Sequence, residues 1–142
     1  MSAVDFTEWA APDLELTFGG RTFAVRPPSV DDAAKLLALA VRGEVNLGVV
    51  PPGTEIPDAI LEVLAKIGPD EHPALGSTFA EMRDFGLSAA TIDRTAYYAV
   101  FYWARGKRYA DALATLLWAP RTSEEGSDSD APAGGGGARP KG

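Results

Sequence analysis

The chain has 142 residues, of which 46% are hydrophobic and 23% charged, a balance typical of one globular domain. Its formal net charge of −7 argues against a nucleic-acid partner, because binding to phosphate backbones needs a surplus of cations. The lack of cysteine excludes disulfides, thiolate metal sites and cysteine nucleophiles, and no stretch approaches the roughly 18 apolar residues of a membrane span.

Two short apolar segments on either side of Gly19-Gly20 predict an N-terminal β-hairpin over residues 14–26. Two glycines supply the positive φ angles of a tight hairpin turn. Pairing across a two-residue loop places Leu16 opposite Phe23, so that the apolar side chains of both strands share one face. A lone hairpin is marginal in water, and this face is therefore expected to cover helices.

Apolar periodicity, together with helix start and stop signals, predicts five helices after the hairpin. Ser29, with Asp32 three residues later, forms a variant capping box at the first helix, and Gly43 is expected to end that helix. Ser88 is expected to cap the fourth helix in the same way. The predicted helices cover about residues 30–42, 57–67, 74–85, 89–105 and 107–118.

The last part of the chain differs sharply in composition from the rest. Residues 121–142 contain no Leu, Ile, Val, Met or aromatic residue, so they cannot bury enough apolar surface to fold. We therefore predict a mainly α (α+β) fold, with an N-terminal hairpin packed on a bundle of about five helices. This single globular domain is expected to cover residues 1–120 and to be followed by a disordered tail over residues 121–142.

The sequence offers few groups for chemistry. His72 is the only histidine, and a zinc site around it would have to draw its other ligands from carboxylates. No serine lies in a nucleophile elbow, and the glycine runs lack the lysine and Ser/Thr of a phosphate loop. His72 is interpreted as a surface or loop-stabilising residue. We predict no catalytic, cofactor-binding or metal-binding residue, and hence that the protein is not an enzyme.

Five of the aromatic residues lie within the short window 97–103. Two of them, Phe101 and Trp103, are expected in the core, because large aromatic side chains usually supply core area. Two tyrosines form a separate stripe beside the basic end of the same helix. Tyrosine is enriched at protein interfaces, so this stripe has two interpretations, core or partner contact. The candidate protein-binding residues are Tyr98, Tyr102 and Arg105.

Several segments, in this order, resemble a known protein family. They are Glu-Trp-Ala-Ala-Pro-Asp-Leu-Glu-Leu at residues 8–16, the hairpin that runs into Val-Arg-Pro-Pro-Ser at 25–29, Phe-Ala-Glu-Met-Arg-Asp-Phe-Gly at 79–86, and Thr-Ala-Tyr-Tyr-Ala-Val-Phe-Tyr-Trp-Ala-Arg-Gly at 95–106. Over about residues 5–120 the chain resembles the tail assembly chaperones of long-tailed phages and prophages of actinobacteria. The shared pattern has no catalytic signature.

The resemblance implies a protein that binds the long, aggregation-prone tape measure protein, keeps it soluble and promotes tail tube assembly. It implies a location in the cytoplasm of the bacterial host and absence from the mature virion. It also implies that this chain is the short product of a frameshifted pair. The longer product of that pair would recruit tail tube subunits. A linker to such an extension and a plain disordered terminus both explain residues 121–142.

The alternative function is a structural minor tail or head–tail connector protein retained in the virion. The oligomeric state is not fixed by the sequence, and a homo-oligomer is possible. No cofactor, nucleic acid or membrane is expected as a partner.

Overall fold

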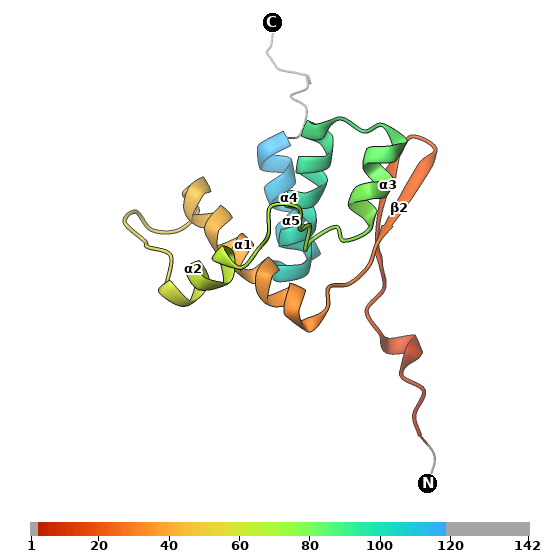
Figure 1. The fold of residues 1–142 in the computed structure, drawn as a ribbon, viewed down its shortest axis with the longest axis horizontal. Coiled ribbons are helices and arrows are strands. Elements are labelled where there is room, and N and C mark those ends of the chain that lie inside the picture. Colours follow the sequence, from red (N-terminus) through yellow and green to blue (C-terminus); the bar gives the residue numbers. More distant parts are fainter. Residues whose placement is uncertain (1–2, 119–142) are drawn as a thin grey trace, which may run out of the picture. The chain divides into compact units, whose positions relative to one another are not determined.

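A computed structural model describes residues 3–118 of the chain (Figure 1). After a 3₁₀ helix at Thr7–Trp9, the described residues form a two-stranded antiparallel sheet and five α-helices, which confirms the predicted α+β fold class. The strands are β1 (Leu14–Phe18) and β2 (Arg21–Val25). The helices are α1 (Val30–Leu47), α2 (Asp58–Ala65), α3 (Thr78–Phe85), α4 (Ala89–Arg105) and α5 (Lys107–Trp118).

The chain divides into two compact units, residues 1–111 and residues 112–142, and α5 belongs partly to each. Within the second unit the structure describes only the helical residues 112–118. The predicted disordered tail, residues 121–142, lies outside the described residues, and a single domain over residues 1–120 stays a prediction. None of the helices in the described range 3–118 combines the length and the apolar character needed to cross a membrane.

The hairpin has the predicted register, with Leu16 opposite Phe23 and Gly19 in the left-handed region at φ 59°. Phe23 is fully buried, and β2 packs against α3. The buried hydroxyl of Thr78, the first residue of α3, donates a 3.1 Å hydrogen bond to the backbone carbonyl of Ala24. The hairpin is therefore stabilised by α3, as the marginal stability of isolated hairpins requires.

Helix α1 is longer than predicted, and the expected stop at Gly43 is wrong. Ser29 caps the helix as expected, because its Oγ accepts a 3.2 Å hydrogen bond from the backbone N–H of Asp32. The helix passes through Gly43 and ends at Gly48, whose φ of 75° is the left-handed conformation typical of helix C-caps. Gly43 is buried inside the helix instead.

The other helix boundaries follow the sequence more closely. Helix α2 begins one residue after Pro57 and ends at Ala65, inside the predicted range 57–67. Helix α3 begins at Thr78, not at residue 74, because Gly76 has a φ of 55° that no right-handed helix can include. Helices α4 and α5 have the predicted bounds, and Ser88 caps α4 through a 3.1 Å bond from the N–H of Thr91.

The buried core of the first unit joins α1, α3 and α4, and α4 packs against both of the other helices. Leu36, Met82 and Phe101, one from each helix, are each exposed by 1% or less. The core position predicted for Phe101 is thus confirmed. Trp103 is only partly buried, and its indole N–H is buried without a hydrogen-bond partner among the described residues.

Candidate interaction surfaces

The two tyrosines of the predicted stripe do lie together on α4. The ring centroids of Tyr98 and Tyr102 are 6.1 Å apart, and both side chains are half-buried. The hydroxyl of Tyr98 donates to Asp111, which also accepts a 2.5 Å bond from Lys107. Burial and the bond to this carboxylate raise the pKa of Tyr98. Part of the stripe is therefore held by contacts within the chain.

Arg105 is exposed, but its guanidinium is engaged by a residue of another helix. Its guanidinium donates two hydrogen bonds to the carboxylate of Glu44 on α1, at 2.8 and 3.0 Å. The hydroxyl of Tyr109 donates a third bond to this carboxylate, at 2.7 Å. The structure thus brings Tyr98 and Tyr102 together but engages Arg105 in a cluster that links α1 to α4 and α5.

The Glu44 cluster, which consists of Glu44, Arg105 and Tyr109, is held together by a charged carboxylate. The Glu44 side chain is only 12% exposed, and its bonds to Arg105 lower the pKa of the carboxyl below the usual range. Burial, followed by the bond to Glu44, raises the pKa of Tyr109 to about 12. The carboxylate is therefore ionised and fully engaged at neutral pH, which suits a structural link between helices.

An open apolar groove lies between α1 and α4, with a volume of about 350 Å³. It is lined by Leu39, Arg42, Gly43 and Asn46 from α1 and by Asp93, Ala96, Tyr97, Val100 and Phe101 from α4. The floor is apolar, whereas the charged and amide side chains belong to residues that are exposed. We call this hollow the α1–α4 groove.

Small residues explain why the two helices leave this hollow. A Cβ atom built on Gly43 would lie 3.0 Å from the Tyr97 hydroxyl and 3.1 Å from the Phe101 ring. The missing side chain lets α4 approach α1 closely at one point, and the short side chain of Ala96 leaves the adjoining space open. This groove was not predicted, because Gly43 was expected to end the first helix. The apolar pattern continues through Leu47, and this indicates a helix that extends beyond Gly43.

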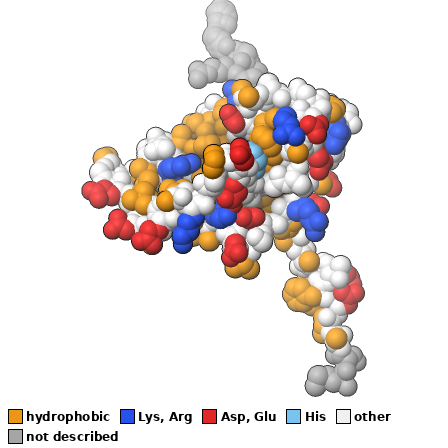
Figure 2. Space-filling model, viewed as in Figure 1, with side chains coloured by type: hydrophobic (Ala, Val, Ile, Leu, Met, Phe, Trp, Pro, Cys, Tyr) orange, Lys and Arg blue, Asp and Glu red, His pale blue; other side chains and the backbone are white. Residues whose placement is uncertain are grey.

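The segment that precedes the hairpin is a second exposed apolar feature, which we call the N-terminal arm (residues 3–13). Every residue of this arm is exposed. The rings of Phe6 and Trp9 pack edge to face with centroids 5.2 Å apart, yet the two residues are 63% and 67% exposed. Figure 2 shows hydrophobic side chains at the lower right, on the part of the chain that leads away from the helices.

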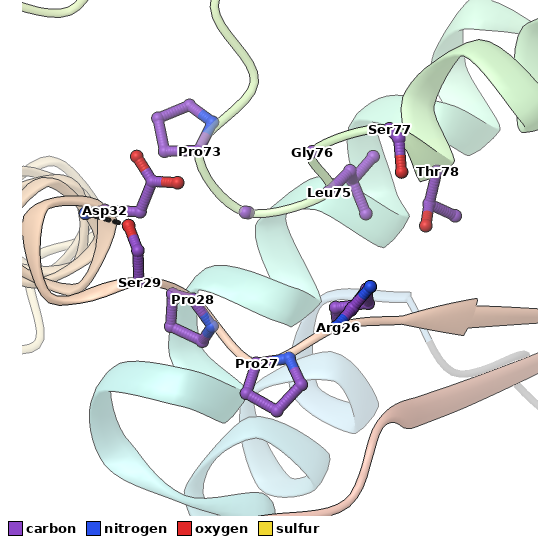
Figure 3. Close-up of a pocket in the computed structure, with 11 residues that line it drawn as sticks. Arg26, Pro27, Pro28, Ser29, Asp32, Pro73, Leu75, Gly76, Ser77 and Thr78 are labelled. Atoms are coloured by element: carbon purple, nitrogen blue, oxygen red, sulfur yellow. Dashed lines mark hydrogen bonds between the residues drawn. The ribbon is translucent and has the colours of Figure 1, made fainter.

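A more polar hollow of about 290 Å³ lies where β2 leads into α1 and where the chain enters α3 (Figure 3). Two of its hydroxyl groups already serve the fold: Ser29 caps α1, and Thr78 bonds to the backbone of β2. Pro27, Pro28 and Pro73 form much of the remaining wall. The hollow thus consists mainly of the groups that connect the hairpin to the helices.

His72 has the loop position predicted for it. Its ring stacks on Phe79, with centroids 3.5 Å apart and planes inclined by 9°. The neighbouring Glu71 accepts a bond from Lys35 on α1 and a 3.0 Å bond from the backbone N–H of Gly68, so this connection is tied to α1. Among residues 3–118 the structure contains no group of three or more His, Asp or Glu side chains that could hold a metal ion.

Comparison with known proteins adds a family but no function. No curated protein and no solved structure matches this chain. One family model matches residues 4–142, which is nearly the whole sequence. The chain therefore belongs to the family described as a domain of unknown function, DUF7426.

Proposed function

We propose that the protein is a tail assembly chaperone that binds the tape measure protein, keeps it soluble and promotes tail tube assembly. The α1–α4 groove is the observation that supports this proposal most directly. An apolar groove between two helices, with charged residues beside it, is a common way to bind the apolar face of an amphipathic helix. The resemblance of residues 5–120 to this chaperone family is the reason for proposing the tape measure protein as the client.

The dimensions of the groove suit a short stretch of helix. Its α1 wall runs from Leu39 to Asn46, which is about 11 Å at the rise of an α-helix. This length matches about two helical turns, so side chains at positions i, i+3, i+4 and i+7 of a client helix would reach the groove. Leu39, Ala96 and Val100 offer the apolar contacts. Arg42 and Asp93 offer one charge of each sign to the polar flanks of the client.

In this proposal the protein acts in the cytoplasm of the bacterial host and is absent from the finished virion. A longer frameshifted form would bring tail tube subunits to the client. The competing function, a minor tail or head–tail connector protein, predicts that the chain stays in the particle. Mass spectrometry of purified virions separates the two, because stoichiometric amounts of this chain in particles would rule out the chaperone.

The groove is tested by co-expressing the chain with a tape measure protein of a long-tailed actinobacterial phage and measuring the soluble, co-purified client. Ala96→Glu should reduce binding by about tenfold or more, because it places a charge in the apolar floor. Ala34→Glu, which adds the same charge at an exposed position of α1, should bind like the wild type. Full binding by a folded Ala96→Glu variant would exclude the groove.

A further variant decides between the groove and the tyrosine stripe. Tyr102 is half-buried, and by the helical repeat it lies on another face of α4 from Ala96. If Tyr102→Ala keeps client binding while Ala96→Glu loses it, the client contacts the groove. The opposite pattern, with unchanged far-UV circular dichroism, assigns the client to Tyr98 and Tyr102. Absence of binding by the wild type would overturn the proposed function itself.

A further inference from the structure

We infer that the N-terminal arm of one copy of this protein docks into the α1–α4 groove of a second copy. The arm presents exposed apolar side chains, and the described residues of α1 and α4 leave an open apolar hollow. Exposed apolar patches of this kind on a small protein usually mark interaction sites. The inference needs only these two surfaces of the free protein and does not rest on the proposed function.

The arm carries a compact aromatic anchor. Phe6 and Trp9 are three residues apart, a spacing that places both side chains on one side of a 3₁₀ turn. The turn is fixed locally, because Asp5 accepts bonds from the N–H and the hydroxyl of Thr7 at 3.0 and 2.6 Å. The pair is therefore ordered before it binds, which reduces the entropy lost on association.

The charges of the two surfaces favour this occupant. The arm contains Asp5, Glu8 and Asp13 and no Lys or Arg, so it is purely acidic. On the α1 side of the groove, Arg42 is an exposed cation and Asn46 an exposed amide donor. Asp93, on the α4 side, is the one acidic group among the described residues that line the groove. An arm that lies along the α1 side pairs Glu8 with Arg42 and keeps its acids away from Asp93.

The arm of the same copy is a less suitable occupant. Figure 1 shows residues 3–13 leading from the start of β1 away from the helices of their own unit. Only four residues separate Trp9 from Leu14, where pairing with β2 fixes the chain. One of the four is Pro12, which restricts the backbone further. A second copy can present its groove to the arm without bending this link.

The expected affinity is modest. A reciprocal dimer would bury four aromatic side chains, two from each arm. An aromatic side chain usually buries about 150–250 Å², and two thirds of that area for each gives roughly 400–650 Å² in total. The two grooves would bury a similar area. The sum lies near the roughly 1,200 Å² lower limit of standard interfaces. A reciprocal dimer with a micromolar dissociation constant is therefore expected, with two equivalent arm–groove contacts related by a two-fold axis.

Sedimentation of the full chain at about 5–200 µM tests the dimer. The wild type should shift from monomer to dimer mass, whereas Phe6→Ala combined with Trp9→Ala should stay monomeric. Ala96→Glu should also stay monomeric, and Arg42→Glu, an exposed change that leaves the core intact, should weaken the dimer by about tenfold. Mixing the arm variant with the Ala96→Glu variant should give a heterodimer weaker than the wild-type dimer, because one of the two arm–groove contacts is then intact.

Single cysteines identify the docked segment, since the chain has none of its own. An Ala10→Cys chain mixed with an Asn46→Cys chain should form a disulfide-linked heterodimer, while Ala10→Cys with Asp84→Cys on α3 should not. A disulfide formed only within one chain of the Ala10→Cys/Asn46→Cys double variant would overturn docking to a second copy. A wild type that stays monomeric, or a dimer that survives both the arm and the groove variants, would overturn it as well.

This outcome is separable from the client experiment. All measurements of self-association use the free protein, so they can fail while the client still binds, or succeed while it does not. If the client uses the same groove, removing residues 2–9 should strengthen client binding, because the arm no longer competes. That last expectation rests on the proposed function.

Discussion

Glu44 carries a charge that links helices of the fold. Its side chain is 12% exposed and accepts three hydrogen bonds, two from Arg105 and one from Tyr109. Glu44→Gln is expected to lower the free energy of unfolding by about 1–2 kcal/mol near neutral pH, because hydrogen bonds to an ionised group are stronger than those to an amide. Arg105 is partly solvated, which keeps the effect below that of a fully buried pair.

The pH dependence of this difference has a definite sign. The folded pKa of Glu44 lies below its ordinary value of 4.5, so the carboxylate stabilises the fold fully above that pH and less as pH falls through the folded value. The stabilities of the wild type and Glu44→Gln, measured by urea unfolding, should therefore converge as the pH falls below 4.5 and through the folded pKa. Glu62→Gln, at an exposed position of α2, is the matched control. A gap that stays constant with pH would refute the role of the charge.

At the scale of elements, the contact between α1 and α4 depends on Gly43. The Cβ atom of any side chain at this position would lie 3.0 Å from the Tyr97 hydroxyl and 3.1 Å from the Phe101 ring. Gly43→Leu is therefore expected to destabilise the protein by about 2 kcal/mol or more, even though leucine favours helix formation over glycine. Thermal or urea unfolding measures the change.

A matched substitution separates packing from helix propensity. Ala34→Leu adds bulk to the same helix at an exposed position and should change stability by no more than about 0.5 kcal/mol. If Gly43→Leu were as stable as this control, α4 would not approach α1 as closely as the structure has it. The α1–α4 groove would then differ in shape as well.

At the scale of the whole molecule, the composition of the chain's end makes a separate prediction. Residues 121–142 contain no large apolar side chain, so they offer almost nothing to a hydrophobic core. A chain ending at residue 120 should unfold with a free energy within about 0.5 kcal/mol of the full chain. A chain ending at residue 133, just before the glycine run, serves as an intermediate control. A stepwise loss of stability would show that these residues pack on the fold.

Local features of this protein were predictable from the sequence alone. The pairing of Leu16 with Phe23 follows from a two-residue turn, and the caps at Ser29 and Ser88 follow from groups three residues apart. The bounds of α4 and α5 were also correct, because glycine at position 106 separates two strongly periodic segments. In each case the determining interactions lie within a few residues of one another, and the sequence displays them directly.

The tertiary structure decided the features that depend on residues far apart in the chain. The bond of Arg105 to Glu44, which is 61 residues away in sequence, was not predicted. Gly43 was expected to end a helix, but it is the point where α4 comes close to α1. Neither partner can be identified from local patterns, because a buried pairing or a close helix approach depends on how complete helices pack. The groove between those helices exists for the same reason.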